Sequence, residues 1–224
     1  MSPGSPARSR GGGRLLTGVA WAVLLLGLWL WGRRIADGPG GGPGPKTGDV
    51  AAVGRSFGVP LPPAAHPVKG AEPHRVEIPA VGVSAPVVPR GLDDDGAVDP
   101  PSFDEPGEVG WFGRGTRPGA KGAALLVGHV DTRDRPAVFY GLSAVRPGQK
   151  VGVEGVDGSR AEFTIDDVRV FPRDRFDPRK VYGPREKGRA ELRLITCGGA
   201  YDRKAGTYTA NVVVSAYLTR VAER

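Results

Sequence analysis

The segment Ala190-Glu-Leu-Arg-Leu-Ile-Thr-Cys197-Gly-Gly is an apolar, strand-like run that stops at a thiol and two glycines. Cys197 is the only cysteine among the 224 residues, so no disulfide can form within the chain. An intermolecular disulfide, a small buried side chain and a reactive thiol are the three interpretations open to such a cysteine. Its position at the end of a strand favours the third, a nucleophile.

Segments on both sides of this run are also predicted to be strands. Residues 123–127 read Ala-Ala-Leu-Leu-Val, a continuous apolar run that is typical of a strand buried on both faces. Residues 150–171 contain two apolar runs around a glycine-containing turn, as in a β-hairpin. The other strands are predicted at 75–79, 81–88, 190–196 and 211–219. With short helical turns only at 137–144 and 177–182, the domain is mostly β, a closed or nearly closed barrel of about seven or eight strands.

The N-terminal part of the chain has a different composition. Within residues 1–34, an uncharged apolar stretch from Leu15 to Gly32 is long enough to cross a bilayer as one helix. We predict an uncleaved transmembrane anchor; a cleavable signal peptide is the alternative, although no small-x-small cleavage site follows closely. Residues 35–73 are rich in glycine and proline and are predicted to be a disordered linker. The folded domain is then residues 74–224.

The charge pattern and the metal-binding residue types exclude two classes of function. The net charge is +7, but lysine and arginine are scattered and form no known nucleic-acid-binding motif, so no nucleic acid partner is expected. One cysteine and three histidines do not make a zinc site. The acidic run 93–95 lacks the spacing of a calcium-binding loop. We therefore predict no metal and no cofactor.

His129 follows the apolar run 123–127 almost directly, after Gly128, where the rim of a barrel opens to solvent. A reactive cysteine needs a base or an imidazolium nearby. Because His129 and Cys197 each end a buried strand, the two side chains can meet on one rim. Asp131, two residues further on, either orients the imidazole or shapes a turn.

These residues also carry a family resemblance. Leu194-Ile-Thr-Cys197 and the upstream Gly128-His129 resemble the signature of sortases, and residues 198–203 and 208–214 are similar to class F or class E sortases of high-GC Gram-positive bacteria. The resemblance spans about residues 74–220. It implies an eight-stranded sortase-type barrel with short helical turns, tethered to the cell membrane by the N-terminal helix, with the catalytic domain outside the cell.

The resemblance also implies the chemistry and the partners. Cys197 would attack the scissile bond of an LPxTG-like sorting signal on a surface protein, and His129 would donate and later accept a proton. The acceptor would be a peptidoglycan precursor or another amine. Sortases also use an arginine, usually in the strand after the cysteine, where residues 209–219 contain none. The role is assigned here to Arg203, with Arg193 and Asn211 as the other candidates.

Two other functions stay open at this point. L,D-transpeptidases also use cysteine in cell-wall chemistry, but they resemble a Ser-His-Gly-Cys pattern that this chain lacks at Cys197. A non-catalytic, membrane-anchored domain that binds the cell wall would instead keep Cys197 buried and inert. Rapid, pH-dependent alkylation of the thiol favours the enzyme over the binding domain.

Overall fold

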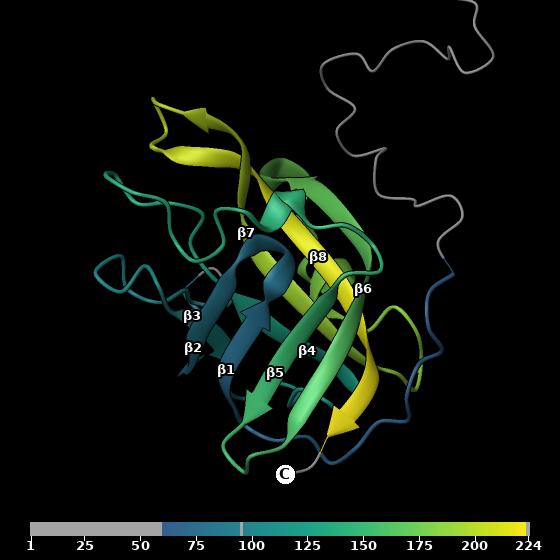
Figure 1. Ribbon diagram of the computed structural model, residues 1–224. Helices are drawn as coiled ribbons and strands as arrows, with labels where there is room; N and C mark the ends of the chain where they lie inside the picture. The colour runs from purple at the N-terminus through teal and green to yellow at the C-terminus, as the bar shows by residue number, and fades with distance from the viewer. Residues whose placement is uncertain (1–59, 95, 223–224) are drawn as a thin grey trace, which may run out of the picture. The chain divides into compact units, whose positions relative to one another are not determined.

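The computed structural model describes residues 60–94 and 96–222 (Figure 1). The predicted transmembrane anchor, residues 1–34, and most of the predicted linker, residues 35–73, lie outside the described residues. In the part that is described, helices are too short or too polar to cross a membrane. The anchor and the linker before residue 60 therefore stay predictions.

Eight strands form a closed barrel in the order β1-β2-β3-β4-β7-β8-β6-β5, and β5 pairs with β1 to close the ring (Figure 1). This confirms the mostly β fold class and the eight-stranded barrel. The strands are β1 (Pro73–Ile78), β2 (Val83–Arg90), β3 (Val109–Phe112), β4 (Gly122–Val127), β5 (Lys150–Gly155), β6 (Arg160–Pro172), β7 (Ala190–Asp202) and β8 (Thr207–Ala222).

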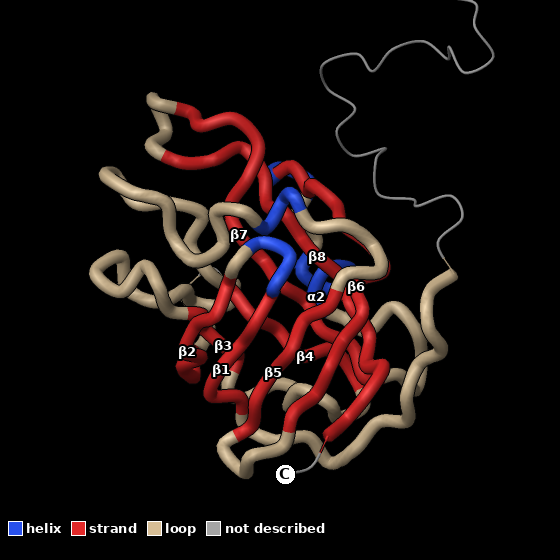
Figure 2. Tube along the Cα trace, viewed as in Figure 1, coloured by secondary structure: helices blue, strands red, loops and turns tan. Residues whose placement is uncertain are grey.

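Within residues 60–94 and 96–222, helical structure is confined to short turns between the strands (Figure 2). The two expected turns are present, as η3 (Leu142–Ala144) and α2 (Pro178–Tyr182). Two further 3-10 turns were not expected, η2 (Pro79–Val81) and η4 (Arg173–Arg175). Each of them lies next to a proline that ends the preceding strand or starts the turn, because proline fixes φ and removes a backbone donor.

β3 was missed by the sequence prediction. It has four residues and a glycine in the middle, which weakens any strand pattern. Gly110 is required there, since a Cβ would lie 2.7 Å from Cγ of Arg90. Trp111 is 3% exposed and fills the barrel, while its indole N–H donates to the carbonyl of Thr116 at 3.2 Å. The strand is therefore held by packing that the local sequence does not reveal.

The strands bury both of their faces. Alternate residues, among them Leu126, Leu192, Leu194, Val212 and Val214, fill the interior of the barrel. The residues between them pack on the outside of β4, β7 and β8 against the connections to β3 and β7. This outer cluster consists of Val98, Leu125, Val127, Val181, Ile195 and Val213. The continuous apolar composition of β4 follows from this two-sided burial, whereas β7 carries the buried charged residues Glu191 and Arg193.

The last part of the predicted linker lies along the barrel. The amide of Ala65 donates to the carbonyl of Leu218 at 2.9 Å, and the amide of Val68 donates to that of Gly119 at 2.8 Å. The Tyr217 hydroxyl donates to the carbonyl of Pro62 at 2.6 Å. Residues 60–72 therefore differ from the expectation for the linker, because backbone hydrogen bonds compensate for their small apolar content.

Candidate active site

Two parallel strands bring the predicted catalytic pair to the same end of the barrel. In the pairing of β4 with β7, Val127 lies opposite Ile195, and the amide of Gly128 donates to the carbonyl of Ile195 at 3.1 Å. Continuing this register by two residues places His129 level with Cys197. Directly before His129, Gly128 has no room for a side chain, since a Cβ would lie 2.7 Å from the ring of Phe139. The predicted meeting of the two residues at one rim is thus present. The expectation that Cys197 ends its strand is wrong, because β7 continues to Asp202 and pairs there with β8 as a hairpin.

Cys197 lies on the outer face of the barrel, two residues after Ile195 of the outer cluster and opposite Asn211 of β8. The side chain is partly exposed. Burial raises the pKa of its thiol, the positive charge of Arg173 lowers it, and the negative charge of Asp131 raises it; the net shift is upward. At neutral pH the thiol is therefore mostly protonated, and the nucleophilic thiolate is a minor species.

The His129 ring is buried, at 8% exposure. Its Nε2 lies 2.7 Å from the carbonyl oxygen of Pro101, and its ring stacks on Phe103 with centroids 4.1 Å apart. The expectation of a histidine open to solvent is therefore wrong, because residues 101–103 of the long connection between β2 and β3 cover it. Since a carbonyl only accepts, Nε2 carries a hydrogen, and Nδ1 is the nitrogen that gains or loses a proton.

Asp131 binds a residue other than His129. The hydroxyl of Tyr208, near the start of β8, donates to the Asp131 carboxylate and thereby raises the pKa of the phenol to about 12. This bond ties the loop after β4 to the hairpin that follows Cys197. Within residues 60–94 and 96–222, the two ring nitrogens of His129 form no hydrogen bond to Asp131, so the role as a loop anchor is the one that the geometry supports.

The two arginines considered from the sequence lie in very different places. Arg203 is exposed in the turn 203–206 between β7 and β8, and the described residues offer its guanidinium no hydrogen bond or ion pair. Arg193 is 1% exposed; its guanidinium lies 2.5 Å from the Glu191 carboxylate and donates to the carbonyl of Gly183 at 3.0 Å. Arg193 is thus committed to a buried ion pair and does not reach Cys197.

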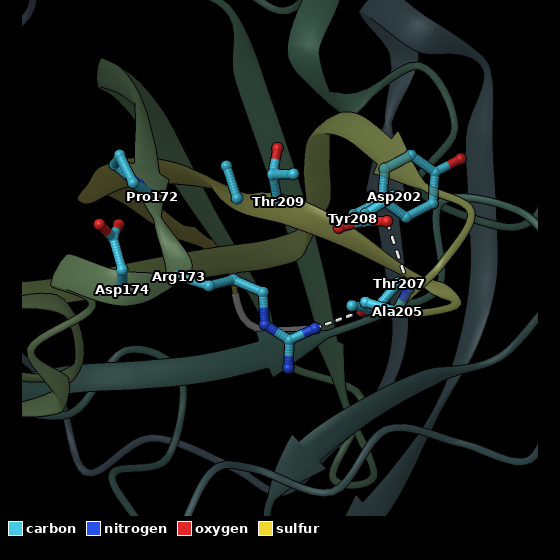
Figure 3. A pocket seen from close by; sticks show the side chains of 9 residues that line it. Pro172, Arg173, Asp174, Asp202, Ala205, Thr207, Tyr208 and Thr209 are labelled. Atoms are coloured by element: carbon cyan, nitrogen blue, oxygen red, sulfur yellow. Dashed lines mark hydrogen bonds between the residues drawn. The ribbon is translucent and has the colours of Figure 1, made fainter.

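Arg173 was not identified from the sequence. It is the first residue of η4, directly after β6, and its guanidinium donates to the hydroxyl of Thr207 in the β7–β8 hairpin (Figure 3). It lines an open pocket between the end of β6 and that hairpin. No local pattern marks it, because its distance from Cys197 depends on how β6 pairs with β8. The other lining residues are Pro172, Asp174, Asp202, Ala205, Thr207, Tyr208, Thr209 and Ala210.

The described residues form no group of three or more histidine, cysteine, aspartate or glutamate side chains that could hold a metal ion. The site instead combines a thiol, an imidazole with a defined tautomer and a guanidinium around one end of a barrel. These are the parts needed for acyl transfer through a covalent thioester.

The comparisons with known proteins agree with this geometry. A family model described as the sortase domain matches residues 76–219. Sortase A of Listeria monocytogenes has a similar fold, with a TM-score of 0.51 and 17% identity over 69% of this chain and 91% of that one. Streptococcus agalactiae sortase C1, in complex with MTSET, has a TM-score of 0.51 and 18% identity over 68% of this chain and 72% of that one.

A lid mutant of sortase A from Corynebacterium diphtheriae has a TM-score of 0.50 and 18% identity, over 70% of this chain and 73% of that one. At these identities the structures establish the fold, and the family model covers more than half of the chain. No curated protein sequence matches it.

Proposed function

Since this chain belongs to the sortase family of cysteine transpeptidases, we propose that it cleaves an LPxTG-like sorting signal and transfers the surface protein to a cell-wall amine. The observation that carries this proposal is the pairing of β4 with β7, which brings His129 level with Cys197 at one rim. The two residues have the roles of proton carrier and nucleophile.

In the proposed reaction, the Cys197 thiolate attacks the carbonyl carbon of the scissile peptide bond. A C–S bond forms, and the carbonyl π electrons move to oxygen. When this tetrahedral intermediate collapses, the C–N bond breaks and the leaving amine takes a proton from Nδ1 of the His129 imidazolium. An incoming amine then attacks the thioester, loses its proton to His129 and releases the thiolate.

The choice of an LPxTG-like signal rests on the family resemblance of Leu194-Ile-Thr-Cys197 and Gly128-His129. Val127, Ile195 and Val213, which precede Cys197 on the same face, are already buried in the outer cluster and are not open to a peptide. We place the scissile bond at Cys197.

The cellular setting is also a proposal. The apolar stretch from Leu15 to Gly32 would anchor the protein in the cell membrane as a single pass, and the linker would hold the catalytic domain outside the cell. There it meets surface proteins with C-terminal sorting signals and a peptidoglycan precursor or another amine. Residues 198–203 and 208–214 favour class F or class E within the family.

The test is thioester formation with an LPxTG-type peptide, followed by mass spectrometry of the protein. Cys197→Ala should abolish the adduct while leaving the fold intact, because the change is small and lies at a rim. His129→Ala should lower turnover by about 10²-fold or more. The control is His74→Ala, since the His74 side chain is 49% exposed on β1. Peptide adducts in the Cys197 variant, or equal losses of turnover in both histidine variants, would contradict the proposal. A wild-type thiol that does not react would favour the non-catalytic wall-binding domain.

A further inference from the structure

The proposed reaction creates a negative charge that the two residues described so far do not stabilise. Attack by the thiolate places that charge on the former carbonyl oxygen, and hydrogen-bond donors fixed beside such an oxygen contribute strongly to catalysis. β8 lies next to Cys197 and presents Asn211 opposite it. From Thr207 to Thr219 this strand contains no lysine or arginine. A cationic donor must therefore come from another element.

The register of the barrel brings the end of β6 close to the thiol. Asn211 of β8 pairs with Cys197 on one side and with Phe171 of β6 on the other. Since neighbouring strands lie about 4.8 Å apart, β6 runs roughly 10 Å from β7 at this level. Arg173 follows Phe171 by two residues, and its long side chain spans most of such a gap. The charge of Arg173 also acts on the Cys197 thiol.

The guanidinium of Arg173 is positioned and still has free donors. One of its nitrogens donates to Thr207, which fixes the side chain against the β7–β8 hairpin (Figure 3). The carboxylate of the neighbouring Asp174 pairs with a different arginine, since its Oδ2 lies 3.8 Å from Nε of Arg175. Across residues 60–94 and 96–222, Arg173 forms no ion pair with a carboxylate. A guanidinium has five N–H groups, so donors remain for a substrate.

Resting on the proposed function, we propose that Arg173, and not Arg203, is the catalytic arginine: it donates hydrogen bonds to the oxyanion formed at Cys197 and stabilises the thiolate before attack. In the acylation step, the negative charge moves from sulfur to the substrate oxygen while the C–S bond forms. In the proposed complex the guanidinium reaches both atoms. In the free enzyme, the charge of Arg173 lowers the pKa of the Cys197 thiol and the charge of Asp131 raises it. The hydroxyl of Tyr208 donates to the same Asp131 carboxylate.

The first experiment needs no substrate, so it does not depend on the proposed function. The rate at which iodoacetamide alkylates Cys197 is measured against pH in the purified full chain. Arg173→Ala should move this profile to higher pH, because a positive charge that favours the thiolate is lost. Arg175→Ala is the matched control, since this neighbouring side chain is 82% exposed. A profile that Arg173→Ala leaves unchanged would overturn the proposal.

The second experiment measures acylation by an LPxTG-type peptide in the same variants, after thermal melts have shown them folded. Arg173→Ala should lower kcat/KM by about 10²-fold. Arg173→Lys should be nearly as impaired, because lysine keeps the charge but loses the planar fork. Near-normal acylation in Arg173→Ala with a large loss in Arg203→Ala would overturn the proposal. Absence of acylation in the wild type would instead contradict the proposed substrate class, leaving the alkylation result to decide on Arg173.

Discussion

The two faces of β7 differ in how they are stabilised. On the inner face, Leu192 and Leu194 pack into a continuous apolar core that is shared by all eight strands. On the outer face, Glu191 and Arg193 form a buried ion pair, Ile195 joins a smaller cluster, and Cys197 ends the row. The inner face thus holds the barrel together, whereas the outer face holds loops and carries the chemistry.

The outer ion pair is unusual because it anchors a connection instead of a strand. The Glu191 carboxylate accepts hydrogen bonds from the amides of Arg185 and Glu186, at 2.9 and 2.8 Å, and Arg193 donates to the carbonyl of Gly183. All of these groups belong to the segment between α2 and β7. One strand thus fixes both the core and the wall beside the thiol, through different residues.

The largest effect is expected from breaking the outer pair. Arg193→Met leaves the Glu191 carboxylate buried without its cation, which costs about 3–5 kcal/mol of unfolding free energy in comparable pairs. The double variant Glu191→Leu/Arg193→Met should recover much of that loss, because neither charge remains. Urea denaturation measures both. If the single and double variants were equally unstable, the pair would act through packing alone.

The same pair predicts a dependence of stability on acid pH. Burial alone would raise the pKa of Glu191, but the amide hydrogen bonds and Arg193 lower it overall. A carboxyl whose pKa is lower in the folded state stabilises the fold above its unfolded pKa, and this contribution is lost as pH falls through the folded pKa. Arg193→Met should therefore flatten the loss of thermal stability below about pH 4.5. A plot of melting temperature against pH that runs parallel to that of the wild type would contradict this prediction.

The inner face is tested by Leu194→Ala. This side chain is completely buried in the barrel, and removing it from a core costs about 2–5 kcal/mol. We expect the melting temperature to fall while the rate of Cys197 alkylation in the folded protein stays close to wild type. A change in that rate would show that the two faces of β7 are not independent.

Residues 60–72 make a smaller contribution from outside the strands. A chain beginning at Ala71 lacks the hydrogen bonds of Pro62, Ala65 and Val68, each worth about 0.5–1.5 kcal/mol. Relative to a chain beginning at Pro60, it should be less stable by about 1.5–4.5 kcal/mol and equally reactive at Cys197. Calorimetry and alkylation compare the two chains. Loss of thiol reactivity in the folded shorter chain would place these residues in the site.

The smallest effect concerns the charge of Asp131, which raises the pKa of the Cys197 thiol. Asp131→Asn removes that charge, so more thiolate is present at neutral pH and alkylation should be faster by about 1.4- to 5-fold, as expected for a partly exposed charge pair worth 0.2–1 kcal/mol. Tyr208→Phe is the matched control, because it removes the same hydrogen bond and keeps the carboxylate. Faster alkylation in both variants would point to loosening of the loop.

The inner face of β7 and its neighbours could be predicted from the sequence. Residues 123–127 are apolar without interruption, alternate residues of 190–194 are apolar, and the hairpin 150–171 has a turn signal. β3 was missed because its four residues include a glycine and its pairing partners are distant. The cover over His129 was missed for a similar reason: Pro101 and Phe103 reach the ring from the connection between β2 and β3.

The candidate site was also predictable only in part. Cys197 and His129 each follow a buried run and are marked by neighbouring glycines, so local sequence indicates them, although β7 itself continues to Asp202. The position of Arg173 depends on a register between β6 and β8 that spans about forty residues of chain, and no local pattern records it. Arg193 was a candidate because it lies on the same strand as Cys197. The acidic Glu191 two residues before it was the signal in the sequence that it is paired.

The closure of the ring bears on self-association. Every strand of the barrel has a hydrogen-bonded neighbour on both sides, so the barrel itself offers no edge on which an extended chain could add as a further strand. β7 and β8, however, run on together beyond the ring as a two-stranded hairpin, as far as Asp202 and Thr207 (Figure 1). Among the described strands, it is therefore this hairpin, whose base holds Cys197, that leaves backbone groups open to pairing with an extended polypeptide.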